Sequence, residues 1–486
     1  MSEELRLWRD NNLNKVSKSF CAAKWLNASL HLGHGFTNSC HLPLPHPIDL
    51  EEIKKNPSAL HNTQHKKEMR KMMLKGKRPA ECSYCWKIED IGRDNISDRV
   101  YKSRIYSQED IKRISEAPFH EDVTLKTVEI SFDRTCNFAC SYCNAGYSTT
   151  WGKEIGKFGP YQKFKTVSAE AYQNDGSWAE KYGKHSEFNP YVEAFLAWWP
   201  ELSQELQELR VTGGEPSASH NFWNFIETLK QHPAENLALA VNSNLGMGSN
   251  TLQKLIQMTK DIKVKAFDLY TSNEAMGPHA EYIRDGLVYE TWRNNLIEFI
   301  ENANFRSVTI MMTINSLCLL SIEEFLDDML VLKKKYGPNR PNIDLNILRW
   351  PGFMSALALP DDIKKQLHYK LRKWYNKNKK NALLNSGEKA QLERLIDYIE
   401  VVEKGHNNTE DDKNLLWHDF KSFYVQYDFR RGKNFKLTFP ELAEWYDSIE
   451  IDQSIESVPM REGAITHFER GEYVSPPGTT PLPKLI

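Results

Sequence analysis

Hydrophobic and polar positions between residues 209 and 348 follow two alternating patterns. Short runs of aliphatic and β-branched residues, typical of buried strands, are followed by longer stretches with apolar residues every three or four positions, typical of amphipathic helices. A first strand-like run begins at Val128, and five more cover Leu209–Thr212, Leu237–Val241, Ile262–Tyr270, Ser307–Ile314 and Ile343–Leu348. The helical stretches between them are Asn221–Lys230, Thr251–Lys260, Thr291–Ile300 and Ile322–Tyr336. This alternation predicts an α/β fold class with a parallel sheet, and six strands fit a partial (β/α)6 barrel of the TIM type.

The patterns divide the chain into an N-terminal region at 1–120, a core at 121–356 and a C-terminal extension at 357–486. In the N-terminal region, the alternation between Phe20 and Cys40 predicts a short hairpin. Within the core, residues 151–189 are aromatic and hydrophilic with little periodicity. We interpret them as a long insertion that either covers the site or is a solvated excursion. A helix with an aromatic face is predicted to follow from Pro190.

The C-terminal extension is predicted to be helical and to pack on the core. Apolar stripes run along Asp361–Lys377 and along residues 387–405, where Gly405 is the expected C-cap. The stretch from Val458 onward is rich in proline and is predicted to be a tail.

Charge and hydropathy exclude two classes of partner. The 486 residues include 63 Lys and Arg against 65 Asp and Glu, a net charge of −2, which is not the balance of a protein that binds duplex nucleic acid through its phosphates. No run of about 18 apolar residues occurs, so no membrane span is expected. The charged N-terminus lacks a signal-peptide core, and we expect a cytoplasmic protein.

Seven of the eight cysteines lie before residue 144, and in a reducing compartment clustered cysteines are more often metal ligands than disulfides. Directly after the first strand, Cys136, Cys140 and Cys143 are spaced four and three positions apart. Three thiolates on one iron–sulfur cube leave one iron without a protein ligand, because such cubes normally have four. The alternatives are a zinc knuckle and a fortuitous group of cysteines. The eighth cysteine, Cys318, stands alone in an apolar run and is predicted to be buried.

The Cys-x3-Cys-x-aromatic-Cys motif, with Tyr142 as its aromatic residue, resembles that of the radical S-adenosylmethionine (radical SAM) superfamily. The resemblance implies a [4Fe-4S] cluster on the three cysteines, with S-adenosylmethionine at the open iron. It also implies reductive cleavage to a 5′-deoxyadenosyl radical that abstracts hydrogen from a substrate.

Further along, Gly213-Gly214-Glu215 follows the second core strand and resembles the family motif that receives the amino group of S-adenosylmethionine. Glycines there allow close backbone approach, and a carboxylate can pair with an ammonium. By the same resemblance, polar residues at later strand ends contact the ribose and the carboxylate. The full set of implied contacts is Tyr142, Gly213, Gly214, Glu215, Asn242, Ser243, Ser272 and Arg284. For Arg284 the alternative is an ordinary surface arginine.

Four earlier cysteines form two pairs, and Cys82 and Cys85 are spaced as a metal knuckle. With Cys21 and Cys40 they suit either structural zinc or a fully ligated cluster. The arrangement resembles the small module of twitch-domain radical SAM proteins, which implies an auxiliary [4Fe-4S] cluster. Nearby histidines are possible substitutes as ligands but are more simply surface or packing residues; they are His31, His34, His41 and His46.

The sequence therefore predicts a radical SAM iron–sulfur enzyme. The resemblance implies an electron donor such as flavodoxin or ferredoxin, and a peptide or protein substrate that the enzyme modifies. A nucleotide, nucleoside or sugar substrate is the alternative. The rival from another class is a non-catalytic zinc or iron–sulfur adaptor. A closed zinc site at Cys136, Cys140 and Cys143 is disfavoured because no fourth cysteine lies nearby in the sequence.

Overall fold

The computed structural model describes residues 2–92, 95–177, 188–403 and 410–456. They belong to two compact units. The first comprises residues 1–133, 180–241 and 261–266, and the second comprises residues 134–179, 242–260 and 267–486.

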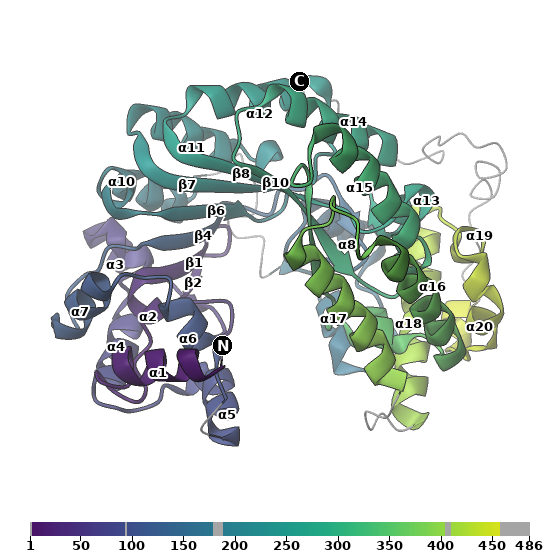
Figure 1. Ribbon diagram of the computed structural model, residues 1–486, viewed down its shortest axis with the longest axis horizontal. Helices are drawn as coiled ribbons and strands as arrows, with labels where there is room; N and C mark the ends of the chain where they lie inside the picture. Colours follow the sequence, from purple (N-terminus) through teal and green to yellow (C-terminus); the bar gives the residue numbers. More distant parts are fainter. Residues whose placement is uncertain (1, 93–94, 178–187, 404–409, 457–486) are drawn as a thin grey trace. The chain divides into compact units, whose positions relative to one another are not determined.

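The first unit contains a mostly parallel sheet in the order β7-β6-β4-β1-β2-β3 (Figure 1). Strands β1, β4, β6 and β7 are parallel, whereas β2 and β3 continue the sheet in antiparallel fashion. The strands are β1 (Asn27–His31), β2 (Phe36–Asn38), β3 (His46–Pro47), β4 (Thr127–Ser131), β6 (Glu208–Thr212) and β7 (Ala234–Ser243), whose last two residues belong to the second unit. The predicted N-terminal hairpin is confirmed as β1 and β2. The parallel pairing of β1 with β4, which extends the core sheet, was not predicted.

Helices of the first unit pack around this sheet and around the N-terminal segment. They are α1 (Ser2–Asn12), α2 (Ala23–Leu26), α3 (Leu50–Lys55), α4 (Gln64–Leu74), α5 (Ser83–Ile91), α6 (Asp98–Ser103), α7 (Gln108–Glu116), α10 (Pro190–Glu205) and α11 (His220–Gln231). The predicted helix at Pro190 is confirmed. Asn189 caps it by accepting a hydrogen bond from the Tyr191 N–H at 2.9 Å. The aromatic side chains of α10 and α11 meet in the core, where the Trp199 and Phe225 rings are 4.8 Å apart.

The second unit contains the parallel strands β8, β10 and β11, in the order β11-β10-β8. These are β8 (Val264–Ser272), of which the first three residues belong to the first unit, β10 (Ser307–Ile314) and β11 (Asn342–Ile347). Three predicted helices follow strands of this part of the chain: α12 (Ser249–Asp261), α14 (Tyr289–Asn302) and α15 (Ile322–Tyr336). A further helix, α13 (Gly277–Ile283), was not predicted. The α/β class is confirmed, and the (β/α)6 barrel stays a prediction.

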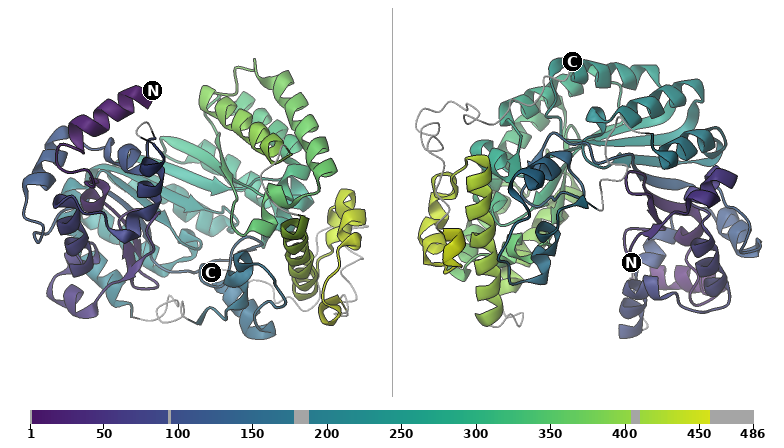
Figure 2. Two further views of the ribbon diagram at one scale, coloured as in Figure 1. Left: turned by 90° about the horizontal axis from the view of Figure 1, so that it is seen from below. Right: turned by 180° about the vertical axis from the view of Figure 1, so that it is seen from behind.

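The C-terminal extension is helical, as predicted. Helices α16 (Asp361–Asn378) and α17 (Ser386–Glu403) lie side by side (Figures 1 and 2). A buried ion pair joins α15 to α17, because Lys333 Nζ lies 2.7 Å from Glu388 Oε1. Gly405 and the stretch from Val458 lie outside the described residues. The remaining helices are α18 (Glu410–Arg431), α19 (Phe435–Thr438), α20 (Ala443–Ser448) and α21 (Gln453–Glu456).

Residues 149–177 are packed into the second unit, where they form α8 (Thr149–Phe158) and α9 (Glu170–Gln173). Tyr161 and Tyr172 are both buried, and each ring centroid lies 5.0 Å from that of Phe423 on α18. The Asp419 carboxylate on α18 accepts hydrogen bonds from the backbone N–H groups of residues 165 and 166. The solvated interpretation of the insertion is therefore wrong for its described part.

Helix α18, which the periodicity did not predict, also carries a buried carboxyl group. Asp428 accepts hydrogen bonds from the Tyr282 hydroxyl and the Phe435 N–H, both at 2.6 Å. Burial raises the pKa of Asp428 to about 7. Among the described helices, none combines the length and apolarity needed to cross a membrane.

Candidate functional site

The Cys136–Cys143 loop belongs to the second unit and is anchored by a short β-bridge. Its strand β5 (Ala139–Cys140) pairs in antiparallel fashion with β9 (Arg284–Asp285). Beyond the bridge, the Ser141 N–H donates to the Ile283 carbonyl at 2.7 Å. These bonds fix the backbone of the central cysteine against the segment that follows α13.

The first turn of α8 holds the other side of the loop. The Cys136 N–H donates to Thr149 Oγ1 at 3.1 Å, and Thr150 Oγ1 donates to the Cys136 carbonyl at 2.7 Å. Further along the helix, Trp151 Nε1 donates to the Cys140 carbonyl at 2.9 Å. Side chains of one helix thus satisfy backbone groups that an irregular loop would otherwise leave without partners.

Two glycines leave room for the loop to pass. A Cβ on Gly246 would lie 2.2 Å from Phe138 Cζ, and a Cβ on Gly286 would lie 2.8 Å from the Asn137 carbonyl oxygen. Gly286 also has a positive φ of 100°, which L side chains rarely adopt. The Asn137 amide donates to the Gly246 carbonyl at 2.8 Å, so the loop is bonded at the point of closest approach.

Hydrogen-bond donors approach two of the three sulfurs. The Phe138 N–H lies 3.4 Å from Cys136 Sγ, and Arg284 Nη1 lies 3.7 Å from Cys140 Sγ. Donors at a sulfur stabilise its thiolate form, which is the form that binds iron. The loop thus presents three half-buried thiols, two of them with a hydrogen-bond donor at sulfur.

Arg284 is held in place by Glu274, a residue that the sequence did not identify. Arg284 donates to Glu274 Oε2 from Nε at 2.9 Å and from Nη2 at 2.7 Å, and both side chains are buried. The Tyr142 hydroxyl donates to Glu274 Oε1 at 2.9 Å. Burial lowers the pKa of Arg284, but the charge of Glu274, together with Tyr142 and Cys140, raises that pKa above its ordinary value. One carboxylate thus positions two of the predicted site residues.

Other predicted contacts of S-adenosylmethionine lie at strand ends of the same unit. Ser243 is buried and its hydroxyl accepts the Leu245 N–H at 3.2 Å. Asn242 donates to Met311 Sδ at 3.9 Å, and its buried Oδ1 has no hydrogen-bond partner among the described residues. A buried acceptor without a donor fits a ligand that supplies one. Ser272 is half-buried at the end of β8.

Gly213, Gly214 and Glu215 belong to the first unit, where they form the turn after β6. Gly213 has a φ of 118°, and a Cβ there would lie 2.7 Å from Ser131 Oγ, so the turn requires glycine. The buried Glu215 accepts the Ser217 N–H at 3.1 Å and its hydroxyl at 2.7 Å. With Asp133 this turn lines a small cavity.

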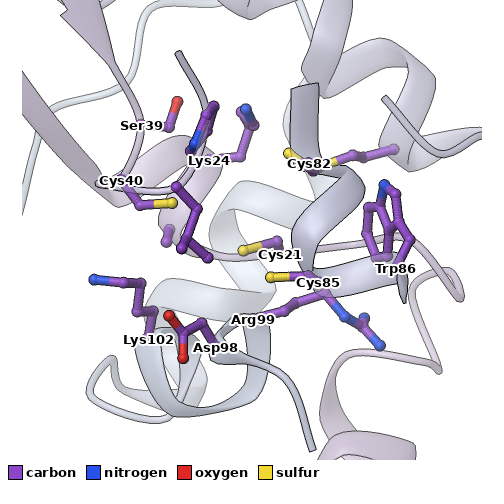
Figure 3. A pocket seen from close by; sticks show the side chains of 14 residues that line it. Cys21, Lys24, Ser39, Cys40, Cys82, Cys85, Trp86, Asp98, Arg99 and Lys102 are labelled. Atoms are coloured by element: carbon purple, nitrogen blue, oxygen red, sulfur yellow. The ribbon is translucent and has the colours of Figure 1, made fainter. Parts of the chain in front are cut away.

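The four N-terminal cysteines line one cavity of the first unit (Figure 3). Cys21 precedes α2, Cys40 follows β2, and Cys82 and Cys85 lie at the start of α5. Burial raises the pKa of Cys82 to about 12 and that of Cys85 to about 11, so both thiols are protonated at neutral pH until a metal displaces their protons. Among the described residues that line this cavity, none is a histidine.

No three Cys, His, Asp or Glu side chains in the described ranges converge on a point where one metal ion would be held. A tetrahedral zinc ion needs such convergence, with sulfurs about 2.3 Å from the metal. In a cube each thiolate binds a different iron, so the sulfurs stand further apart. Both a zinc ion and a cluster use four thiolates, so this cavity has the ligand set of either.

Cys318 is buried, as predicted, and its thiol donates to the Asn315 carbonyl at 3.2 Å. It is the one cysteine of the described second unit outside the Cys136–Cys143 loop.

Comparison with solved structures finds distant similarities. Native anSMEcpe with bound AdoMet is 13% identical with a TM-score of 0.34, over 54% of this chain and 63% of that chain. The anSMEcpe complex with AdoMet and the Cp18Cys peptide is 13% identical with a TM-score of 0.32, over 53% and 62%. Streptococcus suis SuiB bound to S-adenosylmethionine is 12% identical with a TM-score of 0.32, over 73% and 70%.

The chain thus spans less than two thirds of the length of the anSMEcpe structures that it matches. No family model matches the sequence, and no curated protein matches it.

Proposed function

We propose that this chain is a radical SAM enzyme whose reactive centre is held by Cys136, Cys140 and Cys143. The observation that carries the proposal is the loop itself: three thiols on one braced segment, with an arginine donor directed at the middle one. The other cysteine of the described second unit, Cys318, is bonded to a backbone carbonyl. Three ligands without a fourth leave the open iron that the family requires.

The group that these residues would hold is a [4Fe-4S] cluster with S-adenosylmethionine at its fourth iron. When bound, it supplies one-electron cleavage of S-adenosylmethionine to a 5′-deoxyadenosyl radical for hydrogen abstraction. In our proposal, Arg284 stabilises the negative charge of the Cys140 thiolate, and Glu274 holds Arg284 in position. The orphaned acceptor of Asn242 supports a ligand contact there, and Ser243 and Ser272 stand at neighbouring strand ends.

Gly213, Gly214 and Glu215 remain our candidates for the amino group of S-adenosylmethionine. The positive φ of Gly213 and the buried carboxylate of Glu215 are the properties that this role requires. We retain a peptide or protein as the proposed substrate class, with a nucleotide, nucleoside or sugar as the alternative, and flavodoxin or ferredoxin as the electron donor.

We further propose that Cys21, Cys40, Cys82 and Cys85 hold an auxiliary [4Fe-4S] cluster of a twitch-like module. The gathering of all four thiols around one cavity of the first unit supports a shared centre there. Iron and zinc analysis of anaerobically reconstituted protein tests both centres. We expect about eight irons per chain, which is two cubes, and no zinc. A colourless, zinc-containing protein would instead support the adaptor hypothesis.

Reductive cleavage of S-adenosylmethionine tests the enzyme proposal directly. Reconstituted protein with dithionite should form 5′-deoxyadenosine, and Cys136→Ala should abolish it and remove about four irons. Cys318→Ala is the matched control, because it deletes a buried cysteine outside both proposed centres and should retain activity. Failure of iron-loaded wild-type protein to form any 5′-deoxyadenosine would refute the enzyme proposal. Stimulation by a random decapeptide pool, compared with a nucleoside mixture, would then separate the two substrate classes.

A further inference from the structure

The cavity lined by the four N-terminal cysteines contains an unusually placed cation. Lys24 lies on α2, three positions after Cys21, and its side chain is 2% exposed. Figure 3 shows it reaching the side of the cavity where Cys82 lies. A buried ammonium requires a compensating negative charge, because burial without one costs several kcal/mol.

The Glu81 carboxylate meets this need only in part. It forms a salt bridge with Lys24 and a second contact with His65 Nε2 at 2.6 Å, and it remains 20% exposed. The Lys24 ammonium is bonded to this carboxylate and lies in the wall of the cavity that Cys82, the residue after Glu81, also lines. Lys24 is therefore a charged group whose field is directed at the cysteines.

Two further basic side chains near Lys24, those of Lys66 and Arg70, are buried and have no carboxylate in salt-bridge contact in the described part of the chain. Lys66 donates to neutral groups, Thr37 Oγ1 at 2.8 Å and the Asn38 carbonyl at 3.2 Å. Arg70 donates to the Lys24 carbonyl at 3.3 Å. It also contacts Asn62 Oδ1 at 3.0 Å and His61 Nε2 at 2.7 Å. Burial lowers the pKa of Lys66 well below its ordinary value and that of Arg70 to about 9, so we assign the charge that compensates the four thiols to neither of them.

The other cations that line the cavity are differently placed. Arg99 is neutralised by Glu89, with Nε at 3.0 Å from Oε1 and Nη2 at 2.9 Å from Oε2. Lys102 is half-buried, so solvent screens its charge. Of these three side chains, Lys24 is the buried one whose carboxylate partner also contacts a histidine, His65.

We infer that Lys24 compensates the charge of a cluster held by Cys21, Cys40, Cys82 and Cys85, and thereby raises the reduction potential of that cluster. The inference rests on the proposed auxiliary centre. An all-thiolate cluster is anionic and becomes more so when it gains an electron, and net charge is one of the properties that set its potential. Lys24 exchanges neither electron nor proton in this role. It stabilises the reduced state of the centre, which favours accepting an electron over donating one.

The test measures the potential of the auxiliary centre alone. A full-length parent with Cys136, Cys140 and Cys143 all replaced by alanine is reconstituted anaerobically. It is then titrated with dithionite as the one-electron donor and followed by electron paramagnetic resonance. Lys24→Met should weaken one-electron reduction at least tenfold, a shift of about 59 mV to more negative potential. Glu81→Gln should shift the potential in the opposite direction, since it removes a negative charge and leaves Lys24 in place.

Controls separate charge from structure. Lys24→Arg retains the charge and should keep the potential of the parent, and Lys102→Met should change the reduction equilibrium less than about threefold because solvent screens Lys102. If Lys24→Met loses iron, the reduction potentials of Lys24→Arg and Glu81→Gln still test the inference. Shifts of Lys24→Met and Glu81→Gln in the same direction, or none in either, would overturn the inference.

The result is distinguishable from failure of the enzyme proposal. The triple-alanine parent cannot cleave S-adenosylmethionine in any case, so loss of that activity has no bearing on its potential. A parent without iron would overturn both the auxiliary centre and the role of Lys24. The enzyme proposal would still be tested separately, by formation of 5′-deoxyadenosine by the wild-type protein.

Discussion

Replacing Glu274 by glutamine should loosen the support of the Cys136–Cys143 loop. The carboxylate accepts two hydrogen bonds from Arg284 and one from the Tyr142 hydroxyl, at 2.7 to 2.9 Å, and it is 1% exposed. Glutamine keeps the shape of the side chain and an acceptor for Tyr142. It removes the negative charge, however, and turns amide hydrogens toward the guanidinium, which also consists of donors.

The expected cost follows from the burial of the pair. Breaking a buried ion pair by removing one partner costs about 3–5 kcal/mol, because the other charge stays buried without compensation. Glutamine retains one hydrogen bond, so we expect about 3 kcal/mol for Glu274→Gln and a similar loss for Arg284→Met. The double variant leaves no lone buried charge. The free energy of unfolding that the double variant loses should therefore be about 2 kcal/mol smaller than the sum of the losses of the two single variants.

The wild type, the two single variants and the double variant form a double-mutant cycle. Their free energies of unfolding are measured by urea unfolding of the metal-free, reduced proteins, monitored by circular dichroism at several protein concentrations. The exposed pair Arg372 and Asp397, whose atoms are 3.2 Å apart, serves as the matched control. Its coupling energy should be about 0–1 kcal/mol. After reconstitution, Glu274→Gln should also lose iron from the centre at Cys136, Cys140 and Cys143, while the centre on the four N-terminal cysteines keeps its iron.

A coupling energy between Glu274 and Arg284 no larger than that of the exposed pair would refute this reasoning. Full iron loading and full formation of 5′-deoxyadenosine by Glu274→Gln would show that the carboxylate does not position the loop.

Three further predictions concern the second unit. The pKa of Asp428 is about 7 in the folded state and about 3.9 in the unfolded state, so the folded state binds more protons between these pH values. The free energy of unfolding should therefore fall as pH rises from about 4 to about 7, by up to about 1.4 kcal/mol per pH unit. Urea unfolding at a series of pH values should show this slope in the wild type, and its loss in Asp428→Asn; equal slopes would contradict it. Gly246→Ala should force Phe138 aside at a cost of about 1–3 kcal/mol in the free energy of unfolding. Iron analysis should then show less iron at the centre of Cys136, Cys140 and Cys143, and unchanged iron loading would count against the close packing. Lys333→Met should cost about 3–5 kcal/mol in urea unfolding, and adding Glu388→Gln should recover part of that loss; no recovery would show that the pair is not coupled.

Much of the fold could be predicted because its elements are local. The strand at Ser307–Ile314 and the helix at Ile322–Tyr336 are observed over the predicted residues. In each, the apolar residues recur with the period of the element and face one core. The helix α18 escaped prediction because it is buried on several sides, and such a helix has no single apolar stripe. Residues 149–177 escaped prediction because α8 buries only Trp151 and Ile155 and α9 only Tyr172, which are too few positions to form a periodic pattern.

For the site, the spacing of Cys136, Cys140 and Cys143 was enough to propose them as ligands of one centre, because neighbouring residues on one loop are close in any fold. The surroundings of these cysteines became clear only from the folded chain. Glu274 lies 132 positions after Tyr142 and 10 before Arg284, and no motif contains it. Lys24 and Glu81 are likewise 57 positions apart. Their roles arise from burial and charge, which depend on the packing of distant segments and not on spacing along the chain.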